Sequence, residues 1–283
     1  MKILIIGGGQ LSIVINKQLK EKYEISVLDK KINNIDEFIK TNSEKILNTD
    51  IIINTIAVSD TRKCEKEWEN TFKINVELPI KINLLIKDIP KIKFIFISTG
   101  CIFDGNNIPH YENSTPTPHI AYSQQKLISE SFRFIRSNYI IIRPRMIFSD
   151  INIKSNLLKK INSFDSLIDE LNSMTCAYDI AKFIDIICER NLKGIFNFCN
   201  KNLISPKDIK ILINKIHNIY SPIWSISKKE LHKKVGLKLT DTWIESNNIN
   251  DYYDMPDIKV RLSEMIKKSS WLLDNINANN TKQ

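Results

Sequence analysis

A chain of 283 residues with 42% hydrophobic and 26% charged side chains is long enough to bury a sizeable core and has the composition of a globular protein. Its longest apolar runs are far shorter than the roughly 20 residues that span a bilayer, and no signal-peptide cleavage pattern follows the first run. The net charge of +9 comes from lysines scattered along the chain, which argues against a nucleic-acid partner. We therefore expect a cytoplasmic protein without a membrane or nucleic-acid partner.

The cysteines indicate neither a disulfide framework nor a metal site. None belongs to a CxxC pair or has histidines at ligand spacing, and an odd count argues against complete pairing. The five cysteines are Cys64, Cys101, Cys176, Cys188 and Cys199. We expect reduced thiols and no bound metal.

Strand and helix patterns alternate from the N-terminus. Residues 2–6 form a short apolar run that ends in three glycines, residues 10–22 have helical spacing, and residues 24–28 form a second strand. Further strands are predicted over residues 51–54, 92–98 and 140–143, with helices over residues 65–86 and from Tyr122 onward. This alternation predicts an α/β fold with a Rossmann-type doubly wound parallel sheet.

The pattern changes after Pro144. It continues with helices over residues 155–161 and 177–190, a short strand over residues 194–198 and a helix that opens at Ser205. We expect a Rossmann domain at residues 1–143. Residues 144–283 should mostly form a smaller C-terminal substrate-binding lobe, parts of which could return to the sheet.

A glycine turn joins the first strand to the first helix. Missing side chains in this turn let backbone N–H groups approach a pyrophosphate at the helix N-terminus. Ser12 stands where the third glycine of a dinucleotide fingerprint would be, and a glycine turn without a ligand is the alternative interpretation. The residues that we assign to the cofactor here are Gly7, Gly9, Gln10 and Leu11.

Asp29 ends the second strand, where a carboxylate would accept hydrogen bonds from a ribose diol, and this favours NADH. Lys30 and Lys31 follow at once and could bind a 2′-phosphate, so NADPH stays open. A capping aspartate is the alternative for Asp29. The other residues assigned to the cofactor are Lys30, Asn54, Ser98, Tyr122 and Lys126.

Tyr122 and Lys126 lie four residues apart at the start of a helix and share one face. A lysine charge lowers the pKa of a nearby phenol, and the phenol can donate a proton to a carbonyl oxygen that the Thr99 hydroxyl holds. An ordinary surface pair is the alternative for the two residues alone. Because a nucleotide-binding pattern precedes them, the set predicts a ketoreductase.

The chain resembles the extended short-chain dehydrogenases/reductases that act on nucleotide sugars. Ser98-Thr99, the IFDG segment at residues 102–105, the proline-containing loop and the YxxxK pair are similar to dTDP-4-dehydrorhamnose reductase. The segments TGCIF, YSQQK, RPRM, NSMT and RNLKGIFNF are similar to the bifunctional UDP-4-keto-6-deoxyglucose 3,5-epimerase/4-reductase, which also forms the C-terminal part of plant rhamnose synthases. The resemblance covers most of the chain.

The resemblance implies an NAD(P)H-dependent epimerase/4-ketoreductase that converts a UDP-4-keto-6-deoxyhexose, of the rhamnose type or its 2-acetamido analogue, to an L-6-deoxy sugar nucleotide. It implies that Cys101 and Lys160 act as acid/base groups, and a small buried cysteine is the alternative for Cys101. The substrate contacts that we assign are Arg143, Arg145, Asn156 and Asn247. UDP is favoured over dTDP, and a homodimer stays open.

Two other functions stay open. A 4-ketoreductase without epimerase activity has no use for Cys101, and such enzymes commonly carry Asp-Tyr where Gly100-Cys101 stands here. A relative of these reductases serves as a regulatory subunit of methionine adenosyltransferase, which would make the chain a non-catalytic cofactor-binding protein. Retention of Tyr122 and Lys126 argues against that role.

Overall fold

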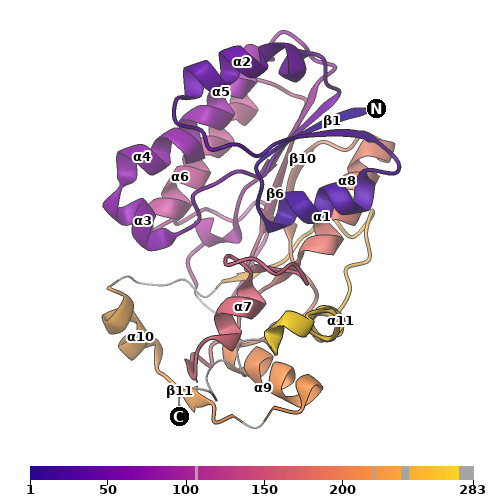
Figure 1. Ribbon diagram of the computed structural model, residues 1–283. Helices are drawn as coiled ribbons and strands as arrows, with labels where there is room; N and C mark the ends of the chain where they lie inside the picture. Colours follow the sequence, from indigo (N-terminus) through magenta and orange to yellow (C-terminus); the bar gives the residue numbers. More distant parts are fainter. Residues whose placement is uncertain (106–107, 220, 237–241, 274–283) are drawn as a thin grey trace.

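A parallel sheet of six strands forms the centre of the protein, in the order β2-β1-β3-β4-β6-β10 (Figure 1). The computed structural model describes residues 1–105, 108–219, 221–236 and 242–273. The strands are β1 (Lys2–Ile6), β2 (Glu24–Leu28), β3 (Ile51–Asn54), β4 (Lys93–Ile97), β6 (Tyr139–Pro144) and β10 (Gly194–Phe198). The sixth strand therefore comes from beyond residue 144.

Helices cover both faces of the sheet (Figure 1). One face carries α1 (Gln10–Leu19) and α8 (Ala177–Arg190), and the other carries α2 (Ile35–Leu47), α5 (Leu78–Leu85) and α6 (Ala121–Ser129). In β1, Ile3 and Ile5 pack on the first face, whereas Leu4 and Ile6 pack on the second, because successive strand side chains alternate. The predicted α/β class with a doubly wound parallel sheet is confirmed.

The single helix predicted over residues 65–86 is wrong. Four pieces stand there: α3 (Thr61–Lys66), α4 (Trp68–Phe72), the π-helical turn η1 (Lys73–Glu77) and α5. Glu67 ends α3 because its φ of −125° and ψ of 51° lie outside the helical region. No helix is predicted from the sequence at α2, although Ile35 and Ile46 are buried and Phe38, Ile39 and Leu47 pack against the same core at helical spacing.

The second part of the chain builds a smaller lobe below the sheet in Figure 1. Its helices are α7 (Leu157–Asn162), α9 (Pro206–His217), α10 (Lys228–Val235) and α11 (Ile258–Lys268). Its strand pairs are β7 (Ile147–Phe148) with β9 (Thr175–Cys176), and β8 (Ser166–Leu167) with β11 (Trp224–Ser225). As predicted, Ser205 is the N-cap of α9, and its Oγ accepts the N–H of Asp208 at 3.0 Å. Within the described ranges no helix has both the length and the apolar character needed to cross a membrane.

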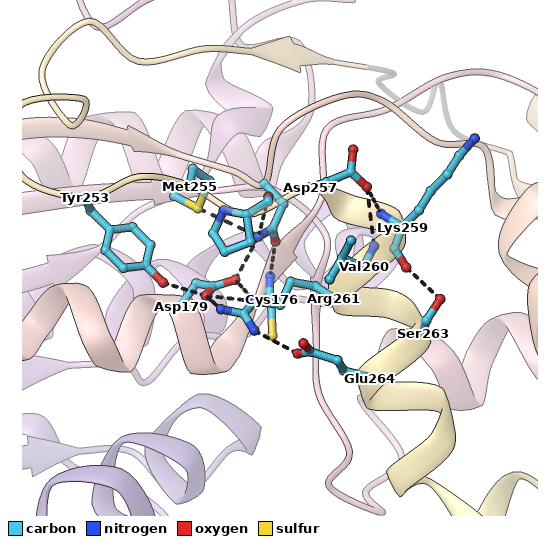
Figure 2. A network of polar contacts seen from close by, with 12 residues as sticks. Cys176, Asp179, Tyr253, Met255, Asp257, Lys259, Val260, Arg261, Ser263 and Glu264 are labelled. Carbon is cyan, nitrogen blue, oxygen red and sulfur yellow. Dashed lines mark hydrogen bonds and ion pairs between the residues drawn. The ribbon is translucent and has the colours of Figure 1, made fainter.

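A buried ion pair joins α11 of the lobe to α8, the helix that covers one face of the sheet (Figure 2). Asp179 of α8 is fully buried, and both of its carboxylate oxygens accept hydrogen bonds from Arg261 of α11, the shortest at 2.7 Å. Tyr253 and Asn200 donate to the same carboxylate at 2.7 Å each. A buried carboxylate with this many donors holds the elements around it in one arrangement.

Candidate active site

The strand order reverses between β1 and β3, and a crevice forms at such a reversal at the carboxyl ends of the strands. Gly7, directly after β1, has a φ of +124°, and a Cβ there would lie 2.6 Å from Thr55 Oγ1, so the position requires glycine. Gly9, the N-cap of α1, has open space where a Cβ would be. No side chain caps α1 and no acidic residue lies in its first turn, so this helix N-terminus is open to a phosphate.

Gln10 and Leu11 can face that crevice only through their backbone. The Gln10 side chain donates to the Ile147 carbonyl at 3.0 Å and accepts a hydrogen bond from Ser149 Oγ at 3.2 Å, which ties α1 to the chain after β6. The Leu11 side chain is buried in the hydrophobic core on the face of the sheet that α1 and α8 cover. Ser12, in the place of a third glycine, is buried without disturbing α1.

Asp29 lies beside the glycine turn. A Cβ on Gly8 would lie 2.8 Å from the Cβ of Asp29, and Asp29 and Lys30 are both exposed. Asn54, the last residue of β3, is buried, and neither polar atom of its side chain has a hydrogen-bond partner among the described residues. An unsatisfied buried amide costs free energy that a ligand could recover. These residues fit a dinucleotide, with its pyrophosphate at the start of α1 and a ribose at Asp29.

Two contacts fix the helix that carries Tyr122. The backbone N–H of Ala121 at the start of α6 donates to the Glu65 carboxylate of α3 at 2.7 Å. Further along α6, the Gln125 side chain accepts a hydrogen bond from Asn75 of η1 at 2.8 Å, in buried surroundings. The broken helix of residues 61–85 thus supplies both groups that orient α6.

Four residues that the sequence assigns to the site lie together here: Tyr122, Thr99, Cys101 and Arg145. Burial, with the nearby thiol of Cys101, raises the pKa of the phenol, whereas the hydroxyl of Thr99 and the charge of Arg145 lower it. The net pKa is raised, so the phenol holds its proton at neutral pH. Tyr122 is partly exposed and can therefore donate that proton to a ligand.

Lys126 points into the protein. It is 1% exposed, its Nζ donates to the Ile97 carbonyl at 2.6 Å, and the same atom lies 4.0 Å from the centre of the Phe96 ring. Burial lowers the pKa of Lys126 to about 7, and the Glu130 carboxylate opposes this shift. No hydrogen bond joins Lys126 to Tyr122, although both residues lie in the described part of the chain.

Cys101 lies in the 3-10 turn η2 (Gly100–Ile102), directly after the end of β4. Its N–H donates to Thr99 Oγ1 at 3.1 Å, and its Sγ accepts a hydrogen bond from Nη1 of Arg145 at 3.3 Å. A Cβ on Gly100 would lie 3.0 Å from Cδ1 of Ile244 in β12 (Trp243–Ile244). The lobe thus occupies the space that a larger residue at position 100 would need.

Lys160 lies on α7 of the lobe, whereas Cys101 and Tyr122 lie on η2 and α6. It is exposed on α7, and no hydrogen bond joins it to Cys101, which the structure also describes. Its neighbour Lys159 donates to Asn152 at 2.8 Å and lies 5.9 Å from the centre of the Trp271 ring. Of the two lysines, Lys160 is therefore the one with an exposed side chain.

Arg143 and Ser98 are used inside the protein, which corrects their assignments to substrate and cofactor. Nε and Nη2 of Arg143 donate to the Glu130 carboxylate at 3.0 and 2.6 Å, and Nη1 donates to the Glu112 carbonyl at 3.3 Å. The Ser98 hydroxyl donates to the same Glu130 at 2.6 Å. All three side chains are buried, and a buried charge requires such partners.

Asn156 is also corrected, whereas Asn247 lies at the surface. Asn156 is fully buried and caps α7: it accepts the N–H of Leu158 at 3.0 Å and donates to the carbonyls of Ser149 and Ile151. A fully buried side chain that holds the protein's own backbone groups does not face a substrate. Asn247 has an exposed side chain.

Glu130 and Glu112 belong to the site but are not identified from the sequence. Glu130 follows Lys126 by four residues, a helical spacing that places an acid on the face of the lysine and could have revealed it. The Glu112 carboxylate accepts the N–H groups of Asn197 and Asn247 at 2.9 and 3.0 Å. These partners lie 85 and 135 residues away, so no local signal exists for Glu112.

The fold and site define an α/β protein with a dinucleotide crevice at a strand reversal and a tyrosine–lysine pair on the adjoining helix. A family model described as "RmlD substrate binding domain" matches residues 1–235, and the chain belongs to this family.

Curated relatives include the spore coat polysaccharide biosynthesis protein SpsK of Bacillus subtilis, 26% identical over 243 residues that cover 82% of this chain and 85% of that protein. A bifunctional dTDP-4-dehydrorhamnose 3,5-epimerase/dTDP-4-dehydrorhamnose reductase of Arabidopsis thaliana is 30% identical over 155 residues. That match covers 52% of this chain and about half, 51%, of the plant protein.

Solved structures share the fold. A UDP-rhamnose synthase of Acanthamoeba polyphaga mimivirus superposes with a TM-score of 0.82 at 21% identity, covering 95% of this chain and 99% of that chain. A dTDP-4-dehydrorhamnose reductase of Bacillus anthracis in complex with NADP has a TM-score of 0.83 at 21% identity, covering 94% of this chain and 99% of that one.

Proposed function

We propose that the protein is an NAD(P)H-dependent reductase of a nucleotide-linked 4-keto-6-deoxy sugar. The observation that carries the proposal is the grouping of Thr99, Cys101 and Tyr122 at the end of β4, beside a crevice that fits a dinucleotide. The activities of the plant relative and of the two solved structures support it, as does the NADP bound to one of them. The cofactor belongs to the domain of residues 1–143, and the sugar to the lobe.

In this proposal the chain's own residues hold the ketone and protonate it. Thr99 donates a hydrogen bond to the carbonyl oxygen, and Tyr122, which keeps its proton because burial raises its pKa, transfers that proton to the same oxygen. NAD(P)H in the crevice would supply the hydride. Lys126, one turn along α6, provides the positive charge that stabilises the tyrosinate.

The same site epimerises the sugar before reduction. Inversion beside a ketone requires a base on one face of the ring and an acid on the other. The Cys101 thiolate accepts the proton, the C–H electron pair forms an enolate whose oxygen faces Thr99 and Tyr122, and Lys160 returns a proton to the opposite face. The carbon is neither oxidised nor reduced. Cys101 follows a sheet strand, whereas Lys160 lies on α7 of the lobe, so the two groups come from different parts of the structure.

Two features support the epimerase. Gly100-Cys101 stands where plain reductases commonly carry Asp-Tyr, and a Cβ at position 100 would lie 3.0 Å from Cδ1 of Ile244, so an aspartate there requires the Ile244 side chain to shift. The plant relative is described as a 3,5-epimerase as well as a reductase. For the nucleotide we propose UDP, with the mimivirus UDP-rhamnose synthase as support, and Arg145 and Asn247 as the substrate contacts.

A substrate panel tests the reductase. UDP- and dTDP-4-keto-6-deoxyglucose and their 2-acetamido analogues are each incubated with the protein and with NADH or NADPH, and the absorbance of the reduced cofactor is followed. We expect oxidation of the cofactor with at least one UDP sugar. No oxidation with any pair would contradict the reductase.

Deuterium exchange tests the epimerase separately. The 4-keto sugar is incubated in D₂O without reduced cofactor, and incorporation is read by mass spectrometry. Wild type should introduce deuterium beside the ketone, Cys101→Ser and Lys160→Ala should not, and Lys159→Ala should behave as wild type. If wild type incorporates none, the protein is a 4-ketoreductase only.

A further inference from the structure

Arg145 connects Cys101, the proposed base, to the lobe. Its Nη1 donates to Cys101 Sγ at 3.3 Å, and its Nη2 donates to Asn172 Oδ1 at 3.1 Å. Its backbone N–H donates to Thr175 Oγ1 at 3.0 Å. One guanidinium group therefore contacts a thiol at the end of the sheet and an amide of the lobe.

Both ends of this connection are fixed. Asn172 exchanges two backbone hydrogen bonds with Ile204, of 3.1 and 3.2 Å, and its Oδ1 also accepts the N–H of Thr242 at 3.0 Å. At the other end, the N–H of Cys101 donates to Thr99, which lies two residues after the end of β4 and caps η2. Because Asn172 and Thr99 cannot shift freely, the guanidinium meets the sulfur in a defined orientation.

The chemistry of this contact is that of a thiolate and its counterion. A neutral thiol is a weak base, whereas a thiolate beside an arginine is favoured and reactive. Two titratable groups of the described residues lie beside Cys101: Arg145, which follows β6, and Tyr122 of α6, whose phenol keeps its proton. From β12 the nearest side chain to this turn is the apolar Ile244. The only one of these groups with a permanent charge is the guanidinium.

We propose that Arg145 is a positioning residue that keeps Cys101 as a thiolate directed into the site, an inference that rests on the proposed epimerase. Arg145 thus acts on the reaction through Cys101, in addition to any contact with substrate. The thiolate accepts a proton from the sugar carbon and passes it on to solvent between turnovers, and the guanidinium remains protonated throughout.

Thiol labelling tests the proposal without any substrate. The full chain is treated with iodoacetamide at about pH 7, and the alkylated Cys101 peptide is quantified by mass spectrometry. Arg145→Met should slow the labelling of Cys101 about tenfold, because the thiolate loses its counterion. Arg145→Lys should recover much of the rate, because an ammonium retains the charge. Above the ordinary thiol pKa, at about pH 10, all variants should react alike.

The molecule contains its own controls. Cys199 donates its thiol to the Ile244 carbonyl at 2.8 Å and burial raises its pKa to about 12, so its labelling should stay slow in every variant. Arg190→Met, an exposed change at the end of α8, should leave Cys101 unaffected. Equal labelling of wild type and Arg145→Met at about pH 7 would overturn the proposal.

The deuterium experiment separates this proposal from the epimerase itself. If wild type exchanges deuterium and Arg145→Met does not, the positioning role is supported in the reaction. If Arg145→Met exchanges at the wild-type rate, the role is overturned. Absence of exchange in wild type would contradict the epimerase, whatever the labelling shows.

Discussion

Lys126 donates a hydrogen bond of 2.6 Å to the carbonyl oxygen of Ile97, the last residue of β4. The ammonium group therefore lies at the end of β4 and contacts the Phe96 ring. It is one turn of α6 from Tyr122, whose tyrosinate it is proposed to stabilise. Burial lowers its pKa to about 7, so the protonated and neutral forms of Lys126 are about equally populated near neutral pH. A catalytic group in such a position should reduce stability.

Lys126→Met should stabilise the fold, and more so at low pH. The pKa is 10.5 in the unfolded chain and about 7 in the folded one. Below the folded pKa both states are protonated and the full cost of burying the charge is present. Between the two values the unfolded state binds more protons, so this cost falls as the pH rises.

Urea denaturation at two pH values checks this prediction. The gain in unfolding free energy over wild type should be larger at about pH 6 than at about pH 9. Lys160→Met, at an exposed position, should show no such difference. A gain for Lys126→Met that is constant or grows with pH would contradict the assigned pKa shift.

Tyr122→Phe should abolish reduction and leave cofactor affinity nearly intact, because the phenol acts only as proton donor. We expect the rate to fall by roughly 10²–10⁴-fold. Steady-state turnover and calorimetric titration with NADPH measure the two effects. Turnover near that of wild type would remove Tyr122 from the mechanism.

The two ends of the glycine turn should respond differently to alanine. Gly9→Ala should fold normally, since its Cβ meets open space, but the methyl group should weaken NAD(P)H binding about tenfold by occupying the approach to the N–H groups of α1. Gly7→Ala should lower the unfolding free energy by about 2 kcal/mol, because of its positive φ and the contact with Thr55. Isothermal titration and urea denaturation separate these effects. Unchanged affinity in Gly9→Ala would place the pyrophosphate elsewhere.

Asp29→Ala should weaken NADH more than NADPH. The carboxylate accepts hydrogen bonds from a ribose diol but repels a 2′-phosphate, so only NADH loses a favourable contact. Calorimetric titration with each nucleotide provides the comparison, with Asp88→Ala, another exposed aspartate, as the control. Equal losses for both nucleotides would mean that Lys30 or Lys31 governs recognition.

Asp179→Asn should destabilise the protein by about 3 kcal/mol, because it leaves Arg261 without its buried counterion (Figure 2). The exposed pair of Lys201 and Asp254, 2.6 Å apart, is the matched control, and Asp254→Asn should cost less than about 1 kcal/mol. Urea denaturation midpoints measure both. Similar losses in the two variants would show that burial does not strengthen the Asp179 contacts.

Local patterns predicted much of this site. Short apolar runs between turn signals identified the six sheet strands, and the spacing of Tyr122 and Lys126 placed them on one face of α6. No helix was predicted at α2, although its apolar residues have helical spacing, and the single helix predicted around Glu67 is wrong. The helix breaks in this region accompany contacts with a distant segment, since Glu65 and Asn75 both form hydrogen bonds with α6.

The sequence by itself determined the parallel sheet, the open glycine turn and the face of α6 that carries Tyr122. These features depend on hydrophobic periodicity and on backbone freedom within a few residues. Only the tertiary structure decided the roles of Arg143 and Arg145, which stand two residues apart in the same RPRM segment. Arg143 meets Glu130 in the interior, whereas Arg145 meets Cys101 and Asn172. The partner of a charged side chain depends on which distant segments pack around it, and no local pattern contains that information.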